Sequence, residues 1–135
     1  MLDVERLAPE RLRPLKRSEY DRLVAMGVFE GERIELLYGT LVEMSLQEPP
    51  HANPVQELTE RLMTALAGRA KVRIQLPFIA ADESEPEPDV AVVPLGDYSR
   101  EHPSRAHFVV EVAHSSLRKD REVKGPLYAA SEVAE

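Results

Sequence analysis

Hydrophobic residues recur along the chain in short runs whose spacing changes between the helical and the extended period. Residues 1–17 contain two prolines and no sustained period, so we expect an N-terminal arm there. Ser18 is the expected N-cap of a short helix that ends at Gly27. Two runs rich in strand-forming residues flank Tyr38-Gly39, which predicts a β-hairpin over residues 33–45.

Two further helices are expected later in the chain. Residues 47–54 hold three prolines and predict a loop, after which an amphipathic helix is expected over residues 55–68. Its buried side is defined by leucine and alanine residues at helical spacing, namely Leu58, Leu62, Ala65 and Leu66. A last helix is expected over residues 116–130, where Pro126 must kink it or mark a new start.

Strands are expected over residues 72–81, 90–93 and 107–112. Strands outnumber helices and are partly consecutive, which favours the α+β class, with helices packed against a mixed β-sheet. No internal repeat or linker divides the rest of the chain. We therefore expect a single domain over residues 18–135, preceded by the arm of residues 1–17.

Composition and charge limit the possible functions. The chain has 135 residues and no cysteine, which excludes a disulfide framework, a thiolate nucleophile and an iron–sulfur site and fits a cytoplasmic location. No apolar run is long enough to span a membrane. The 17 Lys and Arg against 24 Asp and Glu give a net charge of −7. Such a charge argues against a passive high-affinity DNA-binding protein, but it does not exclude an enzyme with a local phosphate site.

Three residues near the last strands form the candidate catalytic group. Asp89 precedes the strand of residues 90–93, Glu111 lies within a valine-rich run, and Lys124 lies on the following helix. A buried carboxylate is costly unless it is paired or binds a cation. Neighbouring strands could bring Asp89 and Glu111 together, and Mg²⁺ would remove their repulsion while keeping water ligands. A nearby lysine could orient or deprotonate such a water for attack on phosphorus.

The sequence resembles a bacterial family of putative restriction endonucleases, formerly a domain of unknown function, within the PD-(D/E)XK nuclease superfamily. The resemblance extends from Arg13 to Glu135 and is carried by RPLKRSEYDRLVAMGVFEGERIELLYGTLVEMS, PPHANPVQELTERL, VRIQLPF, SEPEPDVAVVP and HPSRAHFVVEVAHSSLRKDREVKGPLYAASEVAE. It implies a restriction-endonuclease-like mixed sheet flanked by helices, with Asp89 and Glu111 as metal ligands and Lys124 as the catalytic base or stabiliser.

The same resemblance implies two further residues near the metal. Glu35, in the hairpin, is similar to an additional acidic residue that many such folds place beside the metal, so it is a third expected metal ligand. Gln75 lies at a position that often faces the same cleft.

The sequence departs from the superfamily pattern at three points. The superfamily's catalytic lysine normally lies two residues after the second acid, where this sequence has Ala113. Lys124 can take the role of that lysine only if the lysine has migrated to the neighbouring helix. His114 stands where related sequences commonly carry Asp or Ser. The family usually continues beyond Glu135 into another strand, so we expect either a shortened member or a sheet edge covered by a partner subunit or by residues 1–17.

Other charged residues have alternative interpretations. Glu83, Glu85 and Glu87 are expected to be a solvated approach to the strand, with weak cation attraction as the alternative. A second group is expected to form a solvated helix face, with phosphate contacts as the alternative: Arg118, Lys119 and Arg121. The four histidines lack the spacing of a zinc site, and His51 is expected to cap the helix or to lie in an exposed loop.

These observations lead to two functional hypotheses. The first is a cytoplasmic endonuclease that hydrolyses phosphodiester bonds in DNA with Mg²⁺ (or Mn²⁺), and homodimerisation would suit an enzyme that cuts two strands. The second is a catalytically inactive interaction or assembly module on the same fold, favoured by the acidic charge and the displaced lysine. Convergence of Asp89, Glu111 and Lys124 on one cleft that admits a divalent cation would separate the two.

Overall fold

A three-stranded antiparallel sheet lies at the centre of the fold and positions the candidate residues. It contains β3 (Lys71–Ile74), β4 (Val90–Val93) and β6 (Phe108–Val110), with β4 in the middle. Every residue of β4 is at most 2% exposed, because the strand is covered on both faces. This explains why β4 is a continuous apolar run instead of an alternating one.

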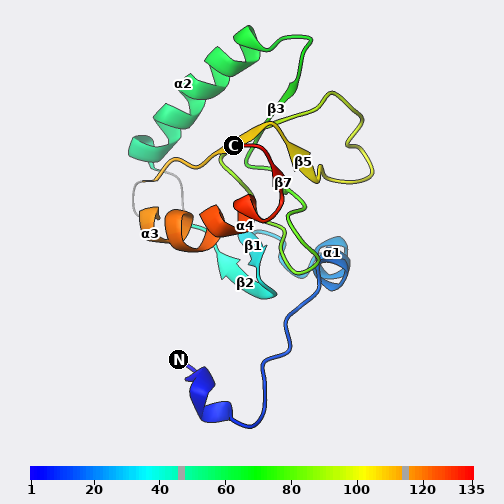
Figure 1. Cartoon of the computed structure of the whole chain (residues 1–135), viewed down its shortest axis with the longest axis vertical. Coiled ribbons are helices and arrows are strands. Elements are labelled where there is room, and N and C mark those ends of the chain that lie inside the picture. Colours follow the sequence, from blue (N-terminus) through cyan, green and yellow to red (C-terminus); the bar gives the residue numbers. More distant parts are fainter. Residues whose placement is uncertain (46–47, 114–115) are drawn as a thin grey trace.

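The computed structural model describes residues 1–45, 48–113 and 116–135, and it has helices combined with small sheets (Figure 1). The predicted α+β class is therefore confirmed. The strand expected over residues 72–81 is shorter than predicted, since Gln75 adopts a positive φ of 51° directly after β3. His114 and its neighbour Ser115 lie outside the described residues.

The predicted β-hairpin is confirmed as β1 (Ile34–Leu37) and β2 (Thr40–Glu43). Tyr38 and Gly39 form the two-residue turn, with φ values of 50° and 77°, the backbone that such a turn requires. The segment of residues 82–88 runs beside the hairpin, because Leu36 and Glu85 exchange two backbone hydrogen bonds of 3.3 and 2.8 Å.

The acidic segment of residues 82–88 differs from the prediction. Glu83 is exposed, but Glu85 is only 2% exposed and Glu87 faces a cavity described below. The expectation of a solvated approach is wrong for the latter two residues. Pairing with Leu36 draws the segment into the interior, and this long-range contact has no signal in local composition.

Helix α1 (Arg17–Ala25) packs beside the hairpin and begins two residues earlier than expected. Its N-cap is Lys16 rather than Ser18, and the Glu19 carboxylate accepts a 3.0 Å hydrogen bond from the Lys16 N–H. Tyr20 is buried and donates its hydroxyl hydrogen to the Ile34 carbonyl at 3.1 Å, which ties α1 to β1. Val24 and Met26, at the C-terminal end of α1, are exposed.

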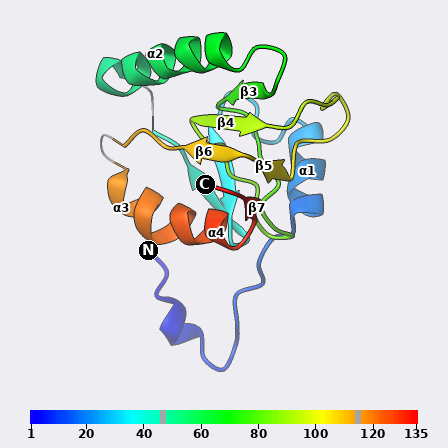
Figure 2. The same cartoon turned by 45° about the horizontal axis from the view of Figure 1, so that its top comes forward.

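Helix α2 (Pro49–Ala65) lies along one side of the sheet, next to β3 (Figure 2). It begins six residues before the expected start, so the loop predicted over residues 47–54 is wrong for residues 49–54. Pro49 and Pro50 occupy the first two helical positions, where a missing N–H costs no hydrogen bond. This early start brings His51 into the first turn of the helix.

The last helical run consists of α3 (Leu117–Lys119), the π-helical turn η2 (Asp120–Lys124) and α4 (Gly125–Ala129). Its extent agrees with the predicted helix over residues 116–130. In the π turn the Gly125 N–H bonds to the Asp120 carbonyl, five residues back. The backbone thus widens just before Pro126, which has no N–H to donate.

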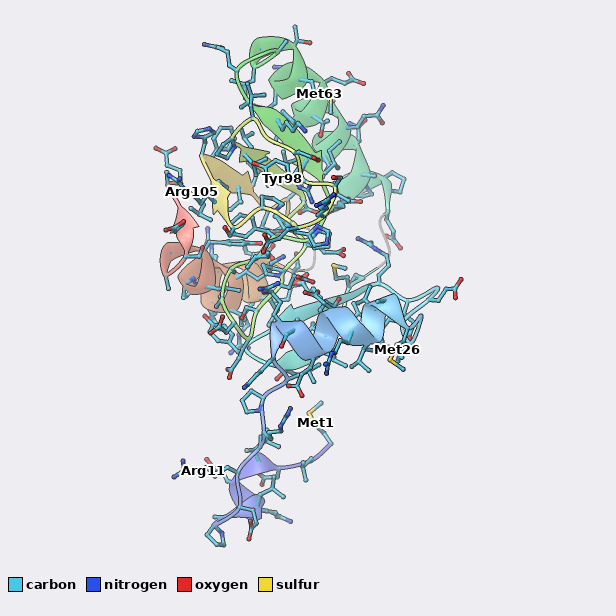
Figure 3. All side chains as sticks on the ribbon, turned by 90° about the vertical axis from the view of Figure 1, so that its right-hand side faces the viewer. Met1, Arg11, Met26, Met63, Tyr98 and Arg105 are labelled. Carbon is cyan, nitrogen blue, oxygen red and sulfur yellow. The ribbon has the colours of Figure 1, made fainter. Side chains whose placement is uncertain are left out.

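The ends of the chain lie in different environments. Strand β7 (Glu132–Val133) runs parallel to β5 (Arg105–Ala106), and the Val109 N–H donates to the Glu135 carbonyl at 2.9 Å. The C-terminal residues themselves therefore contact β6, the edge strand of the central sheet. The N-terminal residues up to Leu12, including the 3₁₀ turn η1 (Val4–Leu7), extend away from the domain (Figure 3).

Candidate active site

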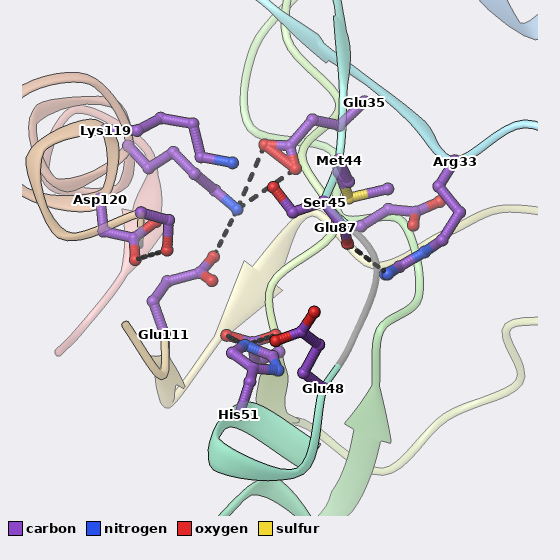
Figure 4. Close-up of a pocket in the computed structure, with 13 residues that line it drawn as sticks. Arg33, Glu35, Met44, Ser45, Glu48, His51, Glu87, Glu111, Lys119 and Asp120 are labelled. Carbon is purple, nitrogen blue, oxygen red and sulfur yellow. Dashed lines mark hydrogen bonds and ion pairs between the residues drawn. The ribbon is translucent and has the colours of Figure 1, made fainter. Parts of the chain in front are cut away.

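A cavity of about 550 Å³ lies between the hairpin, the first turn of α2, the central sheet and the last helical run (Figure 4). Its described lining carries six carboxyl groups and three cationic groups. The full lining is Arg33, Glu35, Met44, Ser45, Glu48, His51, Glu87, Asp89, Glu111, Ser116, Lys119, Asp120 and Lys124. The surplus of carboxylates is the environment expected of a cation-binding site.

Asp89 and Glu111 lie on neighbouring strands and face this cavity. Val90 pairs with Val110 in the antiparallel register of β4 and β6, so Asp89 and Glu111 are the next residues along at the same end of the pair. Residues opposite each other in such a pair point to the same face of the sheet. The valine-rich strands β4 and β6 therefore deliver two carboxylates to one side of the cavity.

Lys124 lies between two carboxylates from distant parts of the chain. Its side chain is 2% exposed, and its Nζ lies 2.6 Å from Glu111 Oε1 and 3.2 Å from Glu35 Oε1 (Figure 4). Burial by itself would lower the pKa of Lys124, but the charges of Glu111 and Glu35 outweigh burial and raise the pKa. The geometry therefore describes an ammonium group shared by two acids.

Glu111 makes a second contact besides the one with Lys124. Its Oε1 also accepts a 2.8 Å hydrogen bond from the Tyr128 hydroxyl. Burial, with the repulsion of Asp89, raises the pKa of Glu111 to about 7, although Lys124 and Tyr128 act in the opposite direction. Repulsion between Asp89 and Glu111 is what a shared divalent cation would relieve.

Asp89 has two hydrogen-bond partners. The Val112 N–H donates to Asp89 Oδ2 at 2.7 Å, and the Nε2 atom of His51 lies 3.1 Å from each carboxylate oxygen. The sequence-based expectation that His51 caps the helix or lies in an exposed loop is wrong, because its side chain is 19% exposed and faces Asp89. The proline pair at residues 49–50, read as a helix start, is the signal that could have placed it.

A family model described as Uma2, putative restriction endonuclease, matches residues 17–135. The chain belongs to this family. No curated protein matches the chain. No helix within the described residues is long and apolar enough to cross a membrane.

The Uma2 resemblance predicted three metal ligands, and the structure brings two of them side by side. Asp89 and Glu111 fit Mg²⁺, which is commonly bound by one or two carboxylates together with water and substrate phosphate. Glu35 faces the same cavity but is paired with Lys124, which lies between it and Glu111. Accordingly, no three Asp, Glu or His side chains among the described residues are grouped closely enough to hold a metal ion.

Glu87 is a further acidic residue of this cavity that sequence reasoning placed in solvent. Burial, with the repulsion of Glu35, raises the pKa of Glu87 to about 7, against the opposing effects of Arg33 and Lys124. Gln75, in contrast, does not line the cavity, and its backbone N–H contacts the Pro88 and Asp89 carbonyls.

The basic residues of the last helical run separate into two groups. Lys119 is half-buried and reaches into the cavity from the helical side (Figure 4). Arg118 is exposed and pairs with Glu122 at 3.0 Å, and Arg121 is exposed as well. The expected solvated face therefore holds for the two arginines but not for Lys119.

Proposed function

We propose that this member of the Uma2 family hydrolyses phosphodiester bonds in DNA with the help of Mg²⁺ or Mn²⁺. The main support is the convergence of Asp89, Glu111 and Lys124 on one cavity, from strand ends and a helix that are distant in sequence. Family membership supports the same reaction class. An acidic chain needs such a local site, because its overall charge repels nucleic acid.

Asp89 and Glu111 are the residues that would hold the divalent cation. When bound, the cation supplies a polarised water and stabilises negative charge on the phosphate oxygens. Both carboxylates are fixed by neighbouring donors: Asp89 by the Val112 N–H, and Glu111 by the Tyr128 hydroxyl. Because these ligands are already fixed, little free energy is needed to reorganise them as charge develops in the reaction.

Lys124 acts in this proposal as an electrostatic stabiliser rather than as a general base. Its nitrogen donates to Glu111 and Glu35, and both contacts favour the protonated ammonium form. An ammonium group has no lone pair with which to take a proton from water. It can instead orient an attacking water and stabilise negative charge on the phosphate.

Lys119 and Arg33 are the proposed contacts of the substrate phosphate. Both line the cavity, and Arg33 is anchored by a 3.0 Å hydrogen bond from its Nη1 to the Ser45 carbonyl. Cationic side chains are needed here, because the surrounding carboxylates would otherwise repel a polyanion.

A cleavage assay tests the proposal with wild-type protein and the Asp89→Ala variant in parallel. Duplex and single-stranded DNA are incubated with Mg²⁺ or Mn²⁺, and EDTA is added to matched samples. We expect cleavage by the wild type that EDTA abolishes and that Asp89→Ala lowers by at least about 100-fold. Asp97→Ala is the matched control, because Asp97 is an exposed aspartate outside the cavity.

Two results would overturn the proposal. Equal cleavage by wild type and Asp89→Ala would assign the activity to another site or to a contaminant. No cleavage of any DNA by the wild type with either cation would favour the alternative, an inactive interaction module in which the Lys124 ion pairs serve only the fold.

A further inference from the structure

His51 contacts the cavity in a way that family membership and the proposed ligands leave unexplained. Its imidazole projects from the first turn of α2 and places Nε2 at 3.1 Å from both oxygens of Asp89. The side chains of His51 and Asp89 are 19% and 12% exposed, so water competes little for this contact. The pair links α2 to the end of β4, two elements that the chain brings together from 38 positions apart.

The other ring nitrogen identifies the tautomer. Nδ1 of His51 is buried and has no hydrogen-bond partner among the described residues. A hydrogen on Nδ1 would therefore be a buried donor without an acceptor, and Nε2 would then face the Asp89 carboxylate without a hydrogen to donate. The favourable arrangement places the hydrogen on Nε2, from where it is donated to Asp89.

We propose that His51 is a positioning residue that fixes the Asp89 carboxylate for cation binding, an inference that rests on the proposed function. A carboxylate has about four lone-pair sites. The Val112 N–H and the His51 N–H hold Asp89 from two sides and leave lone pairs free toward the cavity. Because its Nε2 lone pair is used by hydrogen, His51 is not itself a ligand in this arrangement. Partners of this kind commonly change metal affinity by 10- to 100-fold.

Binding of Mn²⁺ to the protein without DNA measures this role apart from catalysis. Calorimetric titration compares wild type with His51→Ala and His51→Gln, because a glutamine side-chain amide can donate from nearly the position of Nε2. We expect Mn²⁺ affinity to fall at least about tenfold in His51→Ala and to return to within about threefold of wild type in His51→Gln. His107→Ala is the control, since His107 is exposed and lies outside this cavity. Circular dichroism verifies that all variants are folded.

Two outcomes of this titration would overturn the inference. Unchanged affinity in His51→Ala would show that Asp89 needs no positioning, and equal loss in both variants would show that the imidazole is itself a ligand. Failure of the wild type to bind Mn²⁺ would instead overturn the proposed function. In that event the ¹⁵N NMR spectrum of His51 tests the hydrogen bond from Nε2 to Asp89. An Nε2–H signal that shifts in Asp89→Asn supports this hydrogen bond, and an Nδ1–H tautomer overturns the inference.

Discussion

The ammonium group of Lys124 lies between the carboxylates of Glu35 and Glu111, which come from distant parts of the chain. Glu35 is 0% exposed, and its Oε1 lacks a partner with hydrogen-bond geometry even though Lys124 Nζ lies 3.2 Å away. The other oxygen, Oε2, accepts a 3.4 Å hydrogen bond from Lys124 Nζ, so Glu35 depends on this lysine both for that bond and for Coulomb attraction. Its cost of burial is offset only while the lysine stays in place.

Substitution of Lys124 by Ala is expected to affect both stability and activity. Removal of the ammonium leaves two buried acids unpaired, which lowers the free energy of unfolding by about 3–5 kcal/mol. A second substitution, Glu35→Gln, should restore part of this loss, as urea denaturation can measure. Cleavage by the single variant, assayed where it is fully folded, should fall at least about 100-fold. Wild-type cleavage in this variant would exclude Lys124 from the reaction.

Glu111 is expected to make cation binding depend on pH near neutrality. Its pKa is raised to about 7, and a carboxyl group binds a metal ion only after it loses its proton. Mn²⁺ affinity should therefore fall by up to tenfold for each pH unit below about 7 and level off above it. Calorimetry between pH 5.5 and pH 8.5, spanning roughly 1.5 units on either side, measures this dependence. In Glu111→Gln the affinity should be low at every pH; a wild-type affinity that is constant across the range would contradict the prediction.

At the scale of single elements, the segment of residues 82–88 carries a buried acid outside the cavity. Burial, with a hydrogen bond to the Asp21 carboxylate, raises the pKa of Glu85 from 4.5 to about 8, against the attraction of Arg17. Between these two values the folded protein retains a proton that the unfolded chain has lost. Stability therefore falls as pH rises from about 4.5 to about 8.

Replacement of Glu85 by Gln should remove this pH dependence, because an amide stays neutral. At pH near 8 the midpoint of thermal unfolding should rise by roughly 3 °C or more, with little change at about pH 4.5. Glu83→Gln is the control in the same segment, since Glu83 is exposed. Equal shifts in the two variants would indicate an effect of net charge rather than of burial.

The sequence predicted strands and acids better than it predicted long-range neighbours. Asp89 and Glu111 were identifiable because the first precedes a valine-rich run and the second interrupts one, which is a local signal. Glu85 and His51 were not, since the first is buried by pairing with Leu36 and the second depends on where α2 begins. Lys124 was singled out as a cation on the helix that follows the two acids, and the family resemblance supported its role, but its position between two acids is a property of the assembled fold.

The last helical run offers a matched pair of basic residues for testing substrate contact. Binding of a phosphorothioate duplex is measured over a range of salt concentrations for Lys119→Ala and Arg121→Ala. Loss of one phosphate contact in Lys119→Ala should reduce the slope of log affinity against log salt by about 1. Arg121 is exposed outside the cavity, so its variant should keep the wild-type slope. The reverse pattern would place the DNA on the outer face of the helix.

At the scale of the whole molecule, the N-terminal residues project away from the rest of the chain (Figure 3). None of the residues of η1 is buried, whereas Arg13 pairs with Glu19 of α1 at 2.6 Å and the Leu15 N–H donates to the Gly39 carbonyl at 3.0 Å. A C-β atom at position 39 would overlap Pro14, so this junction needs the glycine. Homodimerisation stays a prediction, and the exposed arm is one element that a second copy could contact.

Deletion of residues 1–12 tests the contribution of the arm. Because these residues bury no hydrophobic side chain, the midpoint of thermal unfolding should change by less than about 1 °C. Light scattering on the same two proteins reports the oligomeric state. A dimer that becomes a monomer on deletion would assign the arm to the interface, whereas a loss of several degrees in a monomer would contradict its independence.

The ion pair between Glu35 and Lys124 also has a consequence for the order of assembly. Its two residues are separated by 89 positions, and the hairpin that carries Glu35 is synthesised long before the helical run that carries Lys124. A ribosome adds roughly 5–20 residues per second, so the hairpin waits several seconds for its counter-ion. During that time Glu35 has no counter-ion, and its burial would have a high cost in free energy. The hairpin is therefore expected to dock only when the C-terminal helix arrives, which makes the cavity one of the last regions of the molecule to form and one of the first to open.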